Sequence, residues 1–96
     1  MLGFEKRVVN ALADDADPAL RPGIEAWVEA SLDDLPDHVL LGIRVQSIVL
    51  GAWYRTRDDA SVLRSLQASP LWPVRQYLRA LRSLVLMAQH ELVAST

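Results

Sequence analysis

The segment from Pro36 to Arg55 is apolar around almost its whole circumference when it is placed on a helix, and this feature constrains the fold most. At 100° per residue, Arg44, Ser47, Gly51 and Arg55 fall on one narrow stripe. Nearly every other direction carries an apolar side chain. Helices of this kind are surrounded by other helices, and a chain of 96 residues has few of its own to offer. We therefore predict a buried central helix and association with another protein.

The length of the chain allows one domain, covering residues 1–96. The absence of cysteine excludes disulfides, thiol nucleophiles and thiolate metal sites, and it suits a reducing compartment. The first 15 residues lack the apolar core and small-residue cleavage site of a secretory signal. Arg44 and Gln46 lie in the middle of the apolar segment, where a charge is costly in a membrane, so we expect no membrane span. These observations predict a cytoplasmic protein.

The charges are unevenly divided between the two parts of the chain. Residues 1–38 contain three basic and nine acidic residues, whereas residues 39–96 contain seven arginines and three acidic residues. The two parts can attract one another, or each can face an oppositely charged partner.

Four further helices are expected around the central one. Apolar spacing and proline or aspartate start signals predict them at about 2–15, 22–35, 58–68 and 70–93. The last of these has apolar residues in a 4-3 alternation, a seam for packing on another helix. No strand signal is present. The predicted fold is all-α: a single-domain bundle of four to five helices, with the long apolar helix 36–55 central and helix 70–93 packed along it.

The predicted core draws on three of these helices. It comprises Trp27, Leu41, Val45, Ile48, Val49, Ala52, Leu78, Leu81 and Val85. Gly42 and Gly51 each cost a helix about 1 kcal/mol relative to alanine. Close approach of a neighbouring backbone would offset that cost, so both glycines predict tight helix contacts.

The sequence contains no set of residues that indicates catalysis. His38 and His90, the two histidines, lack a partner at the spacing of a known metal motif. No glycine-rich loop follows a strand, so a phosphate site has no support. We therefore expect no enzymatic activity, no metal and no cofactor.

Two other functions compete with protein association. Arg75, Arg79 and Arg82 lie on one stripe, as in a DNA-reading helix, but that helix begins Pro70-Leu71-Trp72-Pro73, where polar base-reading side chains belong. The three tryptophans and two tyrosines can instead line a pocket for an apolar small molecule. The first alternative is a DNA-binding regulator and the second a helical binding module.

Two segments of the chain carry a family resemblance. LPDHVLLGIRVQSIVLGAW, followed by SPLWPVRQYLRALRSLVLMAQHE, resembles the small helical subunits that accompany flavin-dependent oxidoreductases of the glucose-methanol-choline type. The resemblance covers about residues 20–92. It implies a non-catalytic subunit, with the flavin and the catalytic residues in a larger partner.

The helix at 70–93 also carries large side chains outside its packing seam. An isolated chain gains nothing by exposing them, whereas interfaces commonly place tryptophan, methionine and arginine together at their centres. We predict that a set on this helix contacts the partner: Trp72, Arg75, Arg79, Leu86 and Met87.

Overall fold

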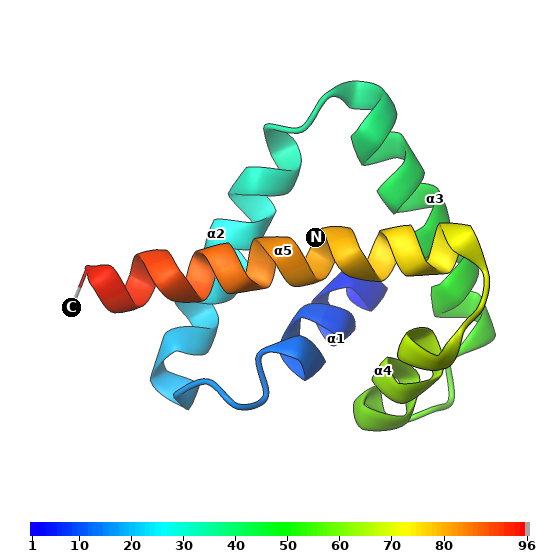
Figure 1. Cartoon of the computed structure of the whole chain (residues 1–96), viewed down its shortest axis with the longest axis horizontal. Coiled ribbons are helices and arrows are strands. Elements are labelled where there is room, and N and C mark those ends of the chain that lie inside the picture. Colours follow the sequence, from blue (N-terminus) through cyan, green and yellow to red (C-terminus); the bar gives the residue numbers. More distant parts are fainter. Residues whose placement is uncertain (96) are drawn as a thin grey trace.

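Five α-helices and one 3-10 turn make up the computed structural model, which describes residues 1–95 (Figure 1). The helices are α1 (Gly3–Leu12), α2 (Arg21–Asp33), α3 (Asp37–Trp53), α4 (Asp59–Ala68) and α5 (Trp72–Ala94), and the 3-10 turn is Pro18–Leu20. No strand occurs in the described residues. The predicted all-α architecture is confirmed.

The helix starts follow the local signals in the sequence. Pro22 lies in the first turn of α2 and Pro73 in the first turn of α5, where a missing N–H removes no helical hydrogen bond. Asp58 is the N-cap of α4, and its Oδ1 accepts a hydrogen bond from the Ser61 N–H at 2.8 Å. The helix predicted from residue 70 begins two residues later, because Leu71 is still extended.

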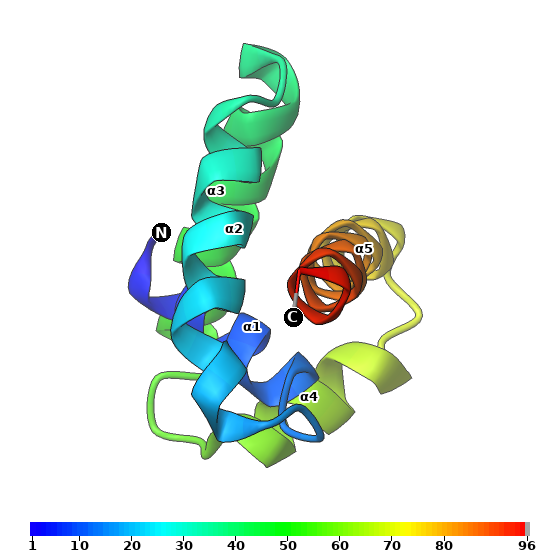
Figure 2. The ribbon, with the colours of Figure 1, turned by 90° about the vertical axis from the view of Figure 1, so that its left-hand side faces the viewer.

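The short helix α1 lies at the centre of the fold. Both α1 and α5 contact all of the other helices, whereas α3 has extensive contacts only with these two. α2 and α3 are joined at one end and diverge from there, and α5 crosses both of them and makes its most extensive contact with α2 (Figures 1 and 2). The prediction that α3 is central, with α5 packed along it, is therefore wrong. α1 displaces α3 from the centre because it fills the space between α3, α4 and α5.

The hydrophobic core lies around α1. Its buried side chains from three helices are Phe4, Val8 and Val9 of α1, Ile24, Val28 and Leu32 of α2, and Leu78, Leu81 and Val85 of α5. The core prediction is confirmed for the three α5 residues. Trp27, also predicted, is partly buried and packs against this core.

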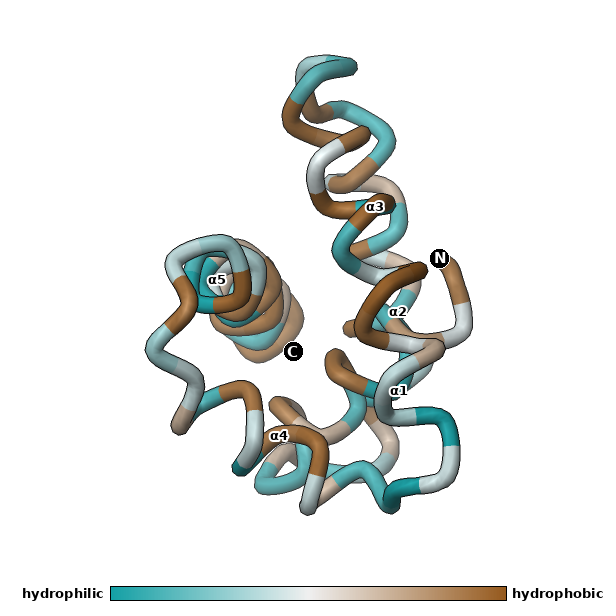
Figure 3. The backbone as a smooth tube through the Cα atoms, turned by 90° about the vertical axis from the view of Figure 1, so that its right-hand side faces the viewer, coloured by the Kyte–Doolittle hydropathy of each residue, from teal (hydrophilic) through white to brown (hydrophobic). Residues whose placement is uncertain are grey.

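The core prediction is wrong for all five α3 residues. Leu41, Val45, Ile48, Val49 and Ala52 are exposed to solvent, and Ile48 retains 65% of its accessible surface. α3 buries Ile43, Ser47 and Leu50 instead. Figure 3 shows polar and apolar residues alternating along α3. By burial, its narrow polar stripe faces the interior of the fold and its broad apolar side faces solvent. Polar contacts with α1, described below, set this orientation.

The two α3 glycines have different surroundings. A Cβ atom on Gly51 would lie 3.1 Å from the Cβ of Phe4, so α1 crosses α3 closely at this point, as predicted. A Cβ on Gly42 would meet nothing within 4 Å, so the predicted close contact is wrong there. Gly42 lies on the outward side of α3.

The described part of the chain contains no candidate for a membrane-spanning helix. None of the helices in residues 1–95 combines the length and the hydropathy that crossing a bilayer requires.

Candidate functional site

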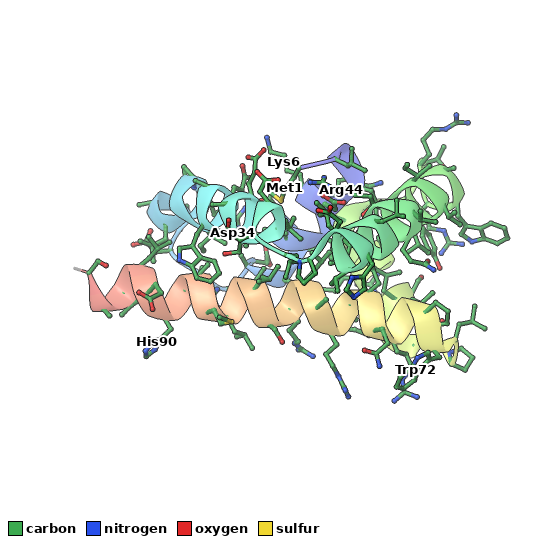
Figure 4. The ribbon with its side chains drawn as sticks, turned by 90° about the horizontal axis from the view of Figure 1, so that it is seen from above. Met1, Lys6, Asp34, Arg44, Trp72 and His90 are labelled. Atoms are coloured by element: carbon green, nitrogen blue, oxygen red, sulfur yellow. The ribbon has the colours of Figure 1, made fainter. Side chains whose placement is uncertain are left out.

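A buried carboxylate joins α1 to α3. Glu5 has no solvent exposure, and its Oε1 accepts hydrogen bonds from Arg44 Nη1 at 2.7 Å and from the Leu2 N–H at 3.1 Å. Its Oε2 accepts from the Ser47 hydroxyl at 2.7 Å. Figure 4 shows Arg44 beside α1. A buried charge is tolerated only when it is paired and hydrogen-bonded, and both oxygens of Glu5 meet this condition.

Tyr77 extends this cluster to α5. Its hydroxyl lies 2.8 Å from Ser47 Oγ, and Ser47 Oγ is also 2.9 Å from the Ile43 carbonyl oxygen. Ser47 has one proton, so when it donates to Glu5, Tyr77 donates to Ser47. Burial raises the pKa of Tyr77 well above its ordinary value, and the Glu5 carboxylate raises this pKa further.

The cluster performs a structural task. Glu5 and Ser47 are almost completely enclosed, so a substrate has no access to the carboxylate or the hydroxyl. Glu5, Ser47 and Tyr77 each have their hydrogen-bond partners within the cluster. Together they join α1, α3 and α5 in one hydrogen-bonded network, which holds the polar stripe of α3 against α1.

Glu5 was not among the residues predicted from the sequence, although a signal was present. Glu5 shares its face of α1 with Val8, Val9 and Leu12, which follow at helical spacings of three, four and seven residues. An acidic residue on the apolar face of a helix has to find donors inside the fold.

The outward side of α3 forms a continuous apolar surface. We call it the α3 apolar face, and it consists of Leu41, Val45, Ile48, Val49, Ala52 and Trp53. Trp53 retains 79% of its accessible surface. Contiguous exposed apolar residues of this kind mark interaction sites in monomeric proteins.

The residues predicted to contact a partner lie on the outer side of α5. All five are exposed, with Trp72 at 67%, Leu86 at 58% and Met87 at 53% of their accessible surface. Their positions fall within an arc of about 120° on the helix. Figure 4 shows Trp72 and His90 pointing away from the rest of the fold on the same side of α5. We call this surface the α5 outer face, and its contact with a partner stays a prediction.

Two grooves adjoin these surfaces. An apolar groove of about 470 Å³ lies between α3 and the start of α5, and its lining includes Val49, Trp53 and Leu71. A second groove of about 410 Å³ lies between α4 and α5 and is lined by Leu66, Gln67, Leu78 and three arginines, Arg75, Arg79 and Arg82. The arginine stripe of the DNA-binding alternative is thus exposed, while the first turn of its helix presents Trp72 to solvent.

The two histidines do not belong to any ligand set. His38 and His90 are exposed on different helices, and residues 1–95 contain no group of three or more His, Cys, Asp or Glu side chains suited to a metal ion. Comparison with protein families, curated proteins and solved structures finds no match to this chain.

Proposed function

We propose that this protein is a non-catalytic, cytoplasmic helical subunit that acts by binding other protein chains. The observation that carries the proposal is the exposure of large apolar side chains on two helices, the α3 apolar face and the α5 outer face. Trp53 and Trp72 are the most exposed large apolar residues of the two faces, so folding of the isolated chain removes little of their surface from water and gains little free energy. A partner that covers these side chains would bury that surface.

The α5 outer face is the proposed contact with a larger partner. Trp72 and Met87 supply apolar area, and Arg75 and Arg79 supply charge without an ion-pair partner in residues 1–95. Aromatic residues, methionine and arginine are enriched in interface cores. The family resemblance suggests that the partner is a flavin-dependent oxidoreductase, which would hold the flavin itself.

Native mass spectrometry of the protein purified from its own cells tests this proposal. We expect a second, larger chain at a fixed stoichiometry, with flavin absorbance if the partner is an oxidoreductase. Trp72→Ala and Met87→Asp should each release that chain, with a loss of at least about 2 kcal/mol of binding for a central tryptophan. Both side chains are more than half exposed, so the fold itself should survive. A larger chain that stays bound to both variants would contradict the proposed contact.

The apolar groove supports a second candidate function. Its volume of about 470 Å³ falls within the range of small-molecule sites, and its lining is mostly apolar. A carrier of an apolar molecule would show that molecule as a fixed added mass under native conditions, without a larger chain. Leu71→Glu would then remove the added mass, because it puts a charge into the groove.

A further inference from the structure

The α3 apolar face has the geometry of a seam for one further helix. Leu41, Val45, Ile48 and Ala52 follow one another at intervals of four, three and four residues, the spacing of helix pairs that pack side by side. No helix of the described chain covers these residues. We infer that α3 of a second copy of this chain packs on the face in an antiparallel orientation. This inference rests on the proposed function, since it names the occupant of one of the two faces.

Charge complementarity at the two ends of α3 supports this occupant. Asp37 lies at the N-terminal end of the face and Arg55 follows its C-terminal end, and both are exposed. Neither forms an ion pair within residues 1–95. An antiparallel pair places Asp37 of each copy near Arg55 of the other, whereas a parallel pair places like charges together. The face between them carries no charge, so its ends select the orientation.

The register of such a pair follows from the length of the helix. α3 extends about 24 Å from Asp37 to Trp53 at 1.5 Å per residue, and Arg55 follows two residues later. A two-fold axis near the middle of α3 sets Val45 of one copy opposite Ile48 of the other, and Leu41 opposite Ala52. Large residues therefore meet smaller ones along the seam. The same surface of each chain is used, as two-fold symmetry requires.

The exposed Gly42 also fits this arrangement. It lines a groove of about 360 Å³ together with Val39 and Gln46 of α3 and Pro73 of α5. In the antiparallel register, Trp53 of the second copy lies within one helical turn of this glycine. The indole can then enter the groove, which a larger side chain at position 42 would fill. In the dimer, the Trp53 indole of the second copy would fill the open space beside Gly42.

Sedimentation equilibrium over a range of concentrations tests the dimer. The unmodified protein should form dimers, and Ile48→Glu should weaken dimerisation at least tenfold, because it sets two carboxylates near the two-fold axis. Gly42→Leu should also weaken it by blocking the groove. Val93→Glu is the matched control, since Val93 is similarly exposed and lies in the last turn of α5, outside both faces. It should leave dimerisation unchanged.

A charge exchange tests the orientation without disturbing the apolar face. Asp37→Arg should weaken dimerisation several-fold, and adding Arg55→Asp should restore it. Circular dichroism confirms that each variant is folded. A protein that stays monomeric at hundreds of micromolar, or an Ile48→Glu variant that dimerises normally, overturns the inference. Loss of the larger partner from Trp72→Ala is measured separately, so failure of the dimer and failure of the proposed function remain distinguishable.

Discussion

Replacement of Glu5 tests the structural account most directly, because this residue orients α3. Glu5→Leu keeps a side chain of similar volume but removes the acceptor for Arg44, Ser47 and the Leu2 N–H. Ser47 can still donate to the Ile43 carbonyl, so its hydroxyl stays satisfied. Arg44 loses its buried partner, and among residues 1–95 it keeps a 4.0 Å ion-pair contact with Asp33.

These contacts set the expected loss in the free energy of unfolding of Glu5→Leu. Breaking a buried ion pair by removing one partner costs about 3–5 kcal/mol when the remaining charge is fully enclosed. The Arg44 side chain is 24% exposed and can recover part of this through water, so we expect a loss at the lower end, about 3 kcal/mol. Glu5→Gln should cost less, since its amide can donate to Ser47 while its oxygen accepts from Arg44.

Urea unfolding monitored by circular dichroism measures these differences. The double variant Glu5→Leu/Arg44→Met removes both charges, and it should regain at least about 1 kcal/mol relative to Glu5→Leu alone. A loss of less than about 1 kcal/mol in Glu5→Leu would refute the role of Glu5 in orienting α3. Additive effects of the changes at positions 5 and 44 in the double-mutant cycle would also refute it.

Three further predictions concern single contacts. In the dilute monomer, Gly42→Ala should raise the free energy of unfolding by about 0.5–1 kcal/mol. Gly51→Ala should not raise it, because the new Cβ would press on Phe4. Equal melting temperatures for the two variants would contradict this prediction. Burial raises the pKa of Tyr77, so its contribution to stability is complete below about pH 10, the unfolded value, and is lost as the pH rises further. Urea midpoints from pH 8 to 11 should fall less steeply for Tyr77→Phe; identical profiles would exclude Tyr77 as the cause. Arg7 donates hydrogen bonds to Asp59 and to two carbonyl groups in the turn between α3 and α4. Lysine lacks the planar guanidinium, so Arg7→Lys should speed amide hydrogen exchange in that turn. Unchanged exchange rates would refute this role of Arg7.

The sequence by itself determines approximately where the helices lie. Proline and aspartate act within one helical turn, so Pro22 and Asp58 mark the starts of α2 and α4 without reference to distant residues. The start of α5 was predicted at Pro70, two residues too early. The seam of α5 was also predictable. Its seam residues recur in a 4-3 alternation along one side, so burial of Leu81 and Val85 follows from amphipathicity. Trp72 and Leu86 lie opposite that seam, on the side that also carries the arginines, so their exposure follows from their position on the helix.

The orientation of α3 was decided by the tertiary structure. A helix that is apolar nearly all round has no strong preference for which side to bury, so hydrophobicity alone does not decide which face is buried. The face predicted from hydrophobicity is the exposed one. Glu5, distant in sequence, is enclosed within the fold and requires donors, and Arg44 and Ser47 provide them. If the polar stripe faced solvent, the buried Glu5 carboxylate would lose the donors on α3. The polar stripe therefore turns inward, and the apolar face, with Trp53 at its end, is left for a partner.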